Sequence, residues 1–209
     1  MISANFKLPK YSSTFNFSEH IRTTVAKANR LLGFIYRSSK SHFNYNSMKL
    51  LYESLVVPTL TYASVVWSPH TDLDFNLLES VHHRFLRYLC YLNGHPMHYN
   101  DHNYKHIISK YRVPSIRNLH DYHDLLVVFK IVNNIISIES LRNLFTSRSL
   151  TYGIRQPRDL EEYIFKFDFL FQSSIPRIIR KWNLISNDIK LARSVSVFKN
   201  NLKCYIFKF

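Results

Sequence analysis

The stretch that most constrains the fold is residues 50–69, LLYESLVVPTLTYASVVWSP, the longest apolar segment of the chain. Its apolar residues recur at helical spacing, with Ser47 as the predicted N-cap. Pro58 lies inside the pattern and lacks an amide donor, so we expect the helix to kink or restart near Val57. Glu53 and Pro58 also leave the uncharged part too short for a membrane span, which favours a buried core helix. The residues expected to line its apolar face are Leu51, Leu55, Leu60, Tyr62, Ala63, Val66 and Trp67.

The order of residues in this stretch is far more specific than a short motif. In sequence it contains Leu51, Tyr52, Ser54, Leu55, Val56, Pro58, Leu60, Tyr62, Ala63, Ser64, Val66, Trp67 and Pro69. This order resembles the segment after the palm domain in reverse transcriptases of non-LTR (LINE-type, jockey-like) retrotransposons, whose pattern is roughly L-Y-x-S-L-V-x-P-x-L-x-Y-A-S-x-V-W-x-P. Val57 and Thr61 depart from it, since the family often has a basic residue at the first position and Glu at the second.

An amphipathic helix is predicted from Glu19 to about Arg37, with Ser18 as its N-cap. Its apolar stripe consists of Ile21, Val25, Ala28, Leu32 and Ile35. Lys27, Arg30 and Arg37 fall on the opposite face, where they form either a solvated surface or a nucleic-acid contact. The sequence HIRTTVAKANRLLGFIYR resembles the family pattern H-I-x-x-x-x-x-K-A-x-x-x-L-G-F-I-x-R. With this resemblance, the nucleic-acid contact and the solvated surface are equally favoured interpretations of the three residues.

A third helix is predicted over residues 73–91, with Arg84 and Arg87 pointing away from its apolar stripe. That stripe consists of Leu77, Leu78, Val81, Phe85, Tyr88 and Leu89. Its sequence LESVHHRFLRYL resembles the family pattern L-E-x-V-Q-R-R-F-L-R-x-L, with His82 at the Gln position. Taken together, the three helices resemble the thumb of the polymerase, which in that family closes over the primer–template duplex.

The C-terminal half also alternates helical patterns with one extended segment. Helices are predicted at 101–111, 116–133 and 138–145, and two more follow N-caps at Ser173 or Ser174 and at Ser194. Within 149–171, the alternation of Tyr163, Phe165, Phe167 and Phe169 indicates a strand or an extended strap against helices. Near the C-terminus the chain resembles the family pattern R-x-x-x-x-W-N-x-L-P…F-K-x-x-L, with Ser186 where the family has Pro. The matching residues are Arg177, Trp182, Asn183, Phe198, Lys199 and Leu202. Trp182 is expected to anchor a core.

We therefore expect a mostly α fold with three parts. Residues 1–17 form a poorly ordered segment that the resemblance assigns to the edge of a palm. Residues 18–92 form a thumb-like helical bundle, and residues 93–209 form a helical C-terminal region with one short extended or β segment.

The composition points to a globular protein with a polyanionic partner. Lys and Arg number 28 against 14 Asp and Glu, a net charge of +14, and hydrophobic residues make up 46% of the chain. Nucleic acid is the first candidate partner, and the alternative is a basic surface that binds nothing. Cys90 and Cys204 form no C-x-x-C pair, and the N-terminus lacks the apolar run of a signal peptide. We expect an intracellular location, nuclear or cytoplasmic, and no membrane segment.

The residues for polymerase chemistry are not found in this sequence. Reverse transcriptases hold two metal ions on adjacent aspartates, and this chain contains no Asp-Asp pair. Asp72 and Asp74 are better explained as helix N-caps. A further set, Cys90, His95, His98, His102 and His106, lacks the usual zinc spacing, so surface histidines are favoured over a metal site. No catalytic residue, metal or cofactor is predicted, and whether the chain serves an enzyme is left open.

The function expected from the resemblance is binding of an RNA or RNA–DNA duplex through backbone phosphates, without the catalytic palm. The predicted contacts are Lys27, Arg30 and Arg37, followed by Arg84, Arg87, Arg177, Arg180 and Lys181. A chain that carries a palm is a possible second partner. The alternative is a structural or interaction remnant of a transposable element that no longer binds nucleic acid.

Overall fold

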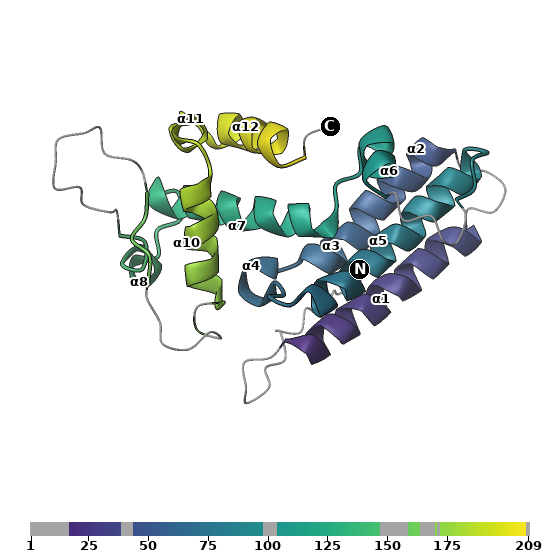
Figure 1. The fold of residues 1–209 in the computed structure, drawn as a ribbon, viewed down its shortest axis with the longest axis horizontal. Helices are drawn as coiled ribbons and strands as arrows, with labels where there is room; N and C mark the ends of the chain where they lie inside the picture. Colours follow the sequence, from purple (N-terminus) through teal and green to yellow (C-terminus); the bar gives the residue numbers. More distant parts are fainter. Residues whose placement is uncertain are drawn as a thin grey trace, which may run out of the picture. The chain divides into compact units, whose positions relative to one another are not determined.

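The computed structural model describes residues 17–38, 44–97, 104–146, 159–163, 170 and 172–207. These residues are predominantly helical, which confirms the predicted mostly α fold (Figure 1). Within the described ranges, none of the helices has the length and apolar character needed to cross a membrane. The chain divides into two compact units, the first of Met1–Ala63 and Pro69–Ile116 and the second of Ser64–Ser68 and Arg117–Phe209. One short segment of the first half, Ser64–Ser68, therefore belongs to the second unit.

The first unit is built on two parallel helices and on a third segment, residues 45–61, that runs in the opposite direction (Figure 1). The long helices α1 (Ser18–Ser38) and α5 (Asp72–Leu92) lie side by side (Figure 1). Ser18 donates a hydrogen bond to Asp74 near their N-termini, and Tyr36 donates one to the carbonyl of Arg84 two-thirds of the way along α5, so the two helices run in the same direction. The elements of this unit are α1 (Ser18–Ser38), α2 (Tyr45–Leu51), η1 (Tyr52–Val56), α3 (Val57–Thr61), α5 (Asp72–Leu92) and α6 (Tyr104–Tyr111).

The restart predicted at Pro58 is confirmed. One turn of π-helix, η1, precedes the proline, and the N–H of Val57 donates to the carbonyl of Tyr52, five residues earlier. Because Pro58 has no N–H and its ring clashes with the preceding turn, this wider turn separates α2 from α3. The predicted N-cap, Ser47, is wrong by three residues, since Asn44 caps α2 and its side chain accepts from the N–H of Ser47.

The apolar face predicted for residues 50–69 is wrong for much of its length. Tyr52, Val56 and Leu60 are fully buried, whereas Leu55 and Tyr62 of the predicted stripe are exposed. Most positions of this stretch are apolar, so the composition does not mark a single buried face, and the π turn shifts the helical phase. Leu60 and Trp67 are buried as predicted, and the remaining exposed members of the stripe are Ala63 and Val66.

The N-terminus of α5 is fixed by a small polar cluster. Thr71 is the N-cap, and its hydroxyl accepts from the N–H of Asp74, so the predicted caps Asp72 and Asp74 lie inside the helix. The carboxylate of Asp74 is buried and accepts hydrogen bonds from the hydroxyls of Thr71 and Ser18. This carboxylate links α5 to the first residue of α1.

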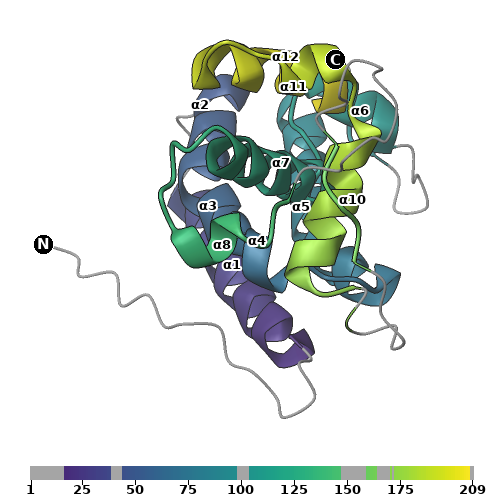
Figure 2. The ribbon, with the colours of Figure 1, turned by 90° about the vertical axis from the view of Figure 1, so that its left-hand side faces the viewer.

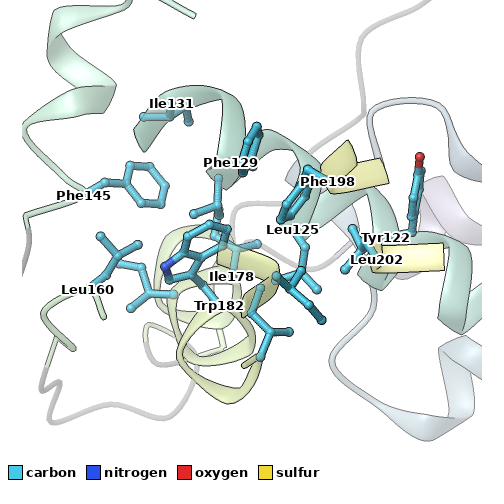
Figure 3. Close-up of a cluster of buried hydrophobic side chains, with 14 residues drawn as sticks. Tyr122, Leu125, Phe129, Ile131, Phe145, Leu160, Ile178, Trp182, Phe198 and Leu202 are labelled. Carbon is cyan, nitrogen blue, oxygen red and sulfur yellow. The ribbon is translucent and has the colours of Figure 1, made fainter. Parts of the chain in front are cut away.

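The second unit packs around α7 (Ile116–Val132) and α10 (Ser174–Leu184). In Figure 1 α10 crosses α7, and in Figure 2, where α7 is seen nearly end-on, α10 lies beside it. Trp182 of α10 is fully buried in the same cluster as Phe129 of α7 and Phe198 of α12 (Val195–Phe207), with its ring centroid 6.1 Å from that of Phe198, which confirms it as a core anchor (Figure 3). The rings of Phe129 and Phe198 stack with their centroids 4.0 Å apart. The elements of this unit are α4 (Ser64–Trp67), α7 (Ile116–Val132), α8 (Glu139–Arg142), α10 (Ser174–Leu184), α11 (Asn187–Lys190) and α12 (Val195–Phe207).

An extended segment is held against α10 by one amide side chain. Asn183 accepts from the N–H of Leu160 and donates to its carbonyl, both at 2.9 Å, as a neighbouring strand would. Lys190, buried beneath the segment, reaches the carboxylate of Asp159 at 2.6 Å. The described part of the predicted strand, residues 159–163, is therefore a strap on a helix, and Phe165, Phe167 and Phe169 lie outside the described residues.

Candidate nucleic-acid interface

The exposed face of α1 carries the basic residues predicted for it. Lys27, Arg30 and Arg37 are all exposed, opposite the buried stripe. Arg22, which the sequence did not single out, is exposed on the same helix. Glu19 in the first turn is the one acidic residue of α1, so the face is strongly positive. The buried stripe consists of Ile21, Thr24, Ala28, Leu32 and Ile35, with Val25 half-buried at its edge.

The two predicted arginines of α5 differ in their surroundings. Arg84 is exposed, and its guanidinium donates to the side-chain oxygen of Asn29 on α1 at 3.1 Å. Because that acceptor is a neutral amide, the hydrogen bond leaves the positive charge of Arg84 uncompensated. Arg87 is half-buried, and its guanidinium carbon lies 5.6 Å from the centre of the Tyr104 ring, within cation–π range. Arg84 thus extends the basic face of α1 onto α5.

Three tyrosines lie in a row beside Arg84, a feature that the sequence analysis missed. The ring centroids of Tyr36 and Tyr88 are 4.1 Å apart, and those of Tyr88 and Tyr91 are 6.5 Å apart. The hydroxyl of Tyr36 donates to the carbonyl of Arg84 at 3.1 Å, and burial raises the pKa of Tyr36, so the phenol stays protonated. The sequence signal was present, because Arg84, Tyr88 and Tyr91 are spaced i, i+4 and i+7 on one face of α5.

Arg177, a predicted phosphate contact, lies inside the second unit. It is nearly fully buried, and its guanidinium forms an ion pair with Asp124 of α7, a carboxylate with no exposed surface, at 3.3 Å. It also donates to the backbone carbonyls of Val65 at 2.8 Å and Ser68 at 3.1 Å. These bonds join α10 to α7 and to the segment around α4. The structure therefore favours a structural role, and we leave Arg177 out of the interface.

Two further predicted residues of α10 also have partners within the second unit. The ammonium of Lys181 lies 2.5 Å from Asp121 and 2.6 Å from Asp124, so two carboxylates already neutralise it. Arg180 is half-buried, and its guanidinium reaches the side-chain oxygen of Gln172 at 3.4 Å. The predicted contacts at Lys181 and Arg180 accordingly receive less support than those on α1 and α5.

Two hydroxyl–imidazole pairs lie in the interior and offer no reactive group to a substrate. Tyr52 and His82 are hydrogen-bonded at 2.9 Å in the first unit, and Ser68 and His120 at 2.9 Å in the second. None of the four side chains is more than 5% exposed. Burial, with a smaller effect of the neighbouring His83, lowers the pKa of His82 to about 3, so its imidazole is neutral. Both pairs are best understood as core hydrogen bonds.

A metal centre finds no support among the described residues. No three His, Cys, Asp or Glu side chains within them are grouped so as to hold a metal ion. Of Cys90 and the histidines that follow it, His98 and His102 lie outside the described residues, and Cys90 is buried at the C-terminal end of α5. The described histidines therefore provide no ligand set from which metal chemistry can be argued.

Comparison of the chain with protein-family models, with curated proteins and with solved structures gave no match.

Proposed function

We propose that the first unit binds a nucleic-acid duplex through its phosphates, along the exposed face of α1 and the adjoining part of α5. The observation that carries the proposal is the segregation of charge on α1, where four exposed cations, Arg22, Lys27, Arg30 and Arg37, accompany one acidic residue. Such a face binds by charge, which gives affinity and little sequence preference. The resemblance to reverse transcriptases indicates an RNA or RNA–DNA duplex as the partner.

The spacing of the cations suits a phosphate backbone. Lys27 and Arg37 are ten residues apart, so they are separated by about 15 Å along the helix axis. A duplex presents a phosphate on each strand every 3.4 Å or so along its axis, so this length faces about four phosphates of one strand. Several contacts along one helix are therefore possible without bending the duplex.

The proposed role is binding and includes no chemical step. Catalysis would require the metal-binding aspartates of a palm, supplied by another chain or by another part of a longer protein. We keep a palm-bearing chain as a second proposed partner, because the resemblance places the thumb next to a palm. If the chain binds no nucleic acid, the structural alternative remains, in which the basic face is only solvated.

The proposal is tested by fluorescence anisotropy with a labelled RNA–DNA duplex at low salt. We expect the wild-type chain to bind and the variant Lys27→Ala/Arg30→Ala/Arg37→Ala to bind at least tenfold more weakly. The matched control is Arg142→Ala/Arg193→Ala/Lys203→Ala, which removes the same charge from exposed positions of the second unit. Equal losses in the two variants would mean that net charge, and not the face of α1, drives binding.

A further inference from the structure

The tyrosine row on α1 and α5 has one anchored end and one open end. Tyr36 is fixed by its hydrogen bond to the carbonyl of Arg84, and Tyr88 packs against it. Tyr91, the last member, is 67% exposed, and its ring lies within 24° of the plane of Tyr88. An aromatic ring held nearly parallel to its neighbour and open to solvent is a surface on which another flat ring can stack.

The positive charge next to the tyrosine row indicates what kind of aromatic ligand would stack on it. Arg84 is exposed at the same face, with its charge uncompensated by the amide of Asn29, and the cations of α1 follow on the neighbouring helix. A partner that brings both a flat aromatic group and negative charge matches this pair of features. A nucleotide does so, since its base stacks on aromatic side chains while its phosphate meets the cations.

We propose that Tyr91 and Tyr88 form a stacking platform for an unpaired base at the end of a duplex bound along α1. The inference rests on the proposed duplex binding and adds a preference for a junction between paired and unpaired nucleotides. A paired base is stacked within the duplex, so its face is covered, whereas an unpaired terminal base exposes a face to the tyrosine. Arg84 lies where it neutralises the phosphate next to that base.

The expected effect is a gain in affinity for a duplex with an overhang. Stacking of one base on an aromatic side chain increases affinity by about fivefold or more. The same RNA–DNA duplex is prepared blunt and with one unpaired terminal nucleotide, and the two dissociation constants are measured by anisotropy at fixed salt. In a parallel sample the unpaired base is 2-aminopurine, whose emission changes when it stacks.

The variants separate stacking from folding and from charge. Tyr91→Ala should abolish the overhang gain while blunt-duplex affinity stays unchanged, and Tyr91→Phe, which keeps the ring, should retain the gain. The control Tyr205→Ala removes an exposed tyrosine of the second unit, 41% exposed, and should change neither value.

Each other outcome overturns the proposal in an identifiable way. Equal, salt-sensitive binding of blunt and overhanging duplexes by the wild-type chain would refute the platform and leave the proposed duplex binding intact. An overhang gain that persists in Tyr91→Ala would place the unpaired base elsewhere. Absence of binding to either duplex at low salt would refute both the platform and the proposed function.

Discussion

Removing the carboxylate of Asp124 should destabilise the second unit more than any single change at its surface. This side chain has no exposed surface and lies between Arg177 at 3.3 Å and Lys181 at 2.6 Å. Asp124→Ala leaves the buried guanidinium of Arg177 without its counterion, and breaking a buried pair in this way costs about 3–5 kcal/mol. Asp121 offers a matched control on the same helix, because it contacts the same lysine but is 33% exposed. Asp121→Asn should therefore lower the free energy of unfolding by less than about 1 kcal/mol.

Urea unfolding followed by tryptophan fluorescence measures the stability of the second unit, to which Asp124 belongs. The chain has 2 tryptophans, and both Trp67 and Trp182 belong to the second unit. With a urea dependence of about 1–3 kcal/mol per M, the midpoint of Asp124→Ala should fall by at least about 1 M. Asp124→Asn keeps the shape and one acceptor oxygen and should fall between the two variants. If Asp124→Ala loses no more stability than Asp121→Asn, the buried pair does not hold this unit together.

Two further predictions follow from buried polar contacts. Asn183→Ala leaves the N–H and the carbonyl of Leu160 without the partners seen in the structure, which should lower the free energy of unfolding by about 1–3 kcal/mol. Limited proteolysis should therefore cut the strap at 159–163 faster in this variant than in the wild type, and unchanged cleavage would contradict this. His82, with a folded-state pKa of about 3 against 6.5 unfolded, binds its proton mainly in the unfolded state, so stability falls as the pH falls from 6.5 towards 3. His82→Gln should reduce this acid-side loss in unfolding experiments at pH 7 and pH 5, by at most about 1.4 kcal/mol per pH unit, and an identical loss in both proteins would refute the assignment.

The sequence predicted the helices well because their signals are local. The amphipathic period located α1 and α5, the proline located the restart at Val57, and Ser194 caps α12 as expected, with its hydroxyl accepting from the N–H of Val197. The buried face of residues 50–69 was not predictable in the same way. Its phase depends on a π turn and on a break at Ala63, where φ is +52°, and neither follows from a helical period.

The break at Ala63 also divides the most informative sequence motif between the two units. Residues up to Ala63 belong to the first unit, whereas Trp67 and Ser68 belong to the second, where Ser68 bonds to His120 and to Arg177. Residues 50–69, one continuous stretch of sequence, therefore contribute buried side chains to the cores of both units. Sequence spacing alone assigned it to one kinked helix, because the hydrogen bonds of Ser68 to His120 and Arg177 join it to residues more than fifty positions away.

The candidate site was predictable on α1 and less so on α10. A helix period places Lys27, Arg30 and Arg37 opposite an apolar stripe, and exposure follows directly. Arg177 carries the same charge, but its burial depends on Asp124, a residue 53 positions earlier in the chain. The contribution of Tyr36 to the aromatic row likewise depends on how α1 packs against α5.

The most direct test of the proposed function is the salt dependence of RNA–DNA duplex binding by the wild-type chain and the Lys27→Ala/Arg30→Ala/Arg37→Ala variant. Each phosphate contact contributes about 0.9 to the slope of log affinity against log salt concentration. If the face of α1 binds the duplex, the triple variant should reduce that slope by about 2.7, and the second-unit control should leave it unchanged. A folded wild-type chain that does not bind at low salt, or a triple variant with an unaltered slope, would contradict the proposal.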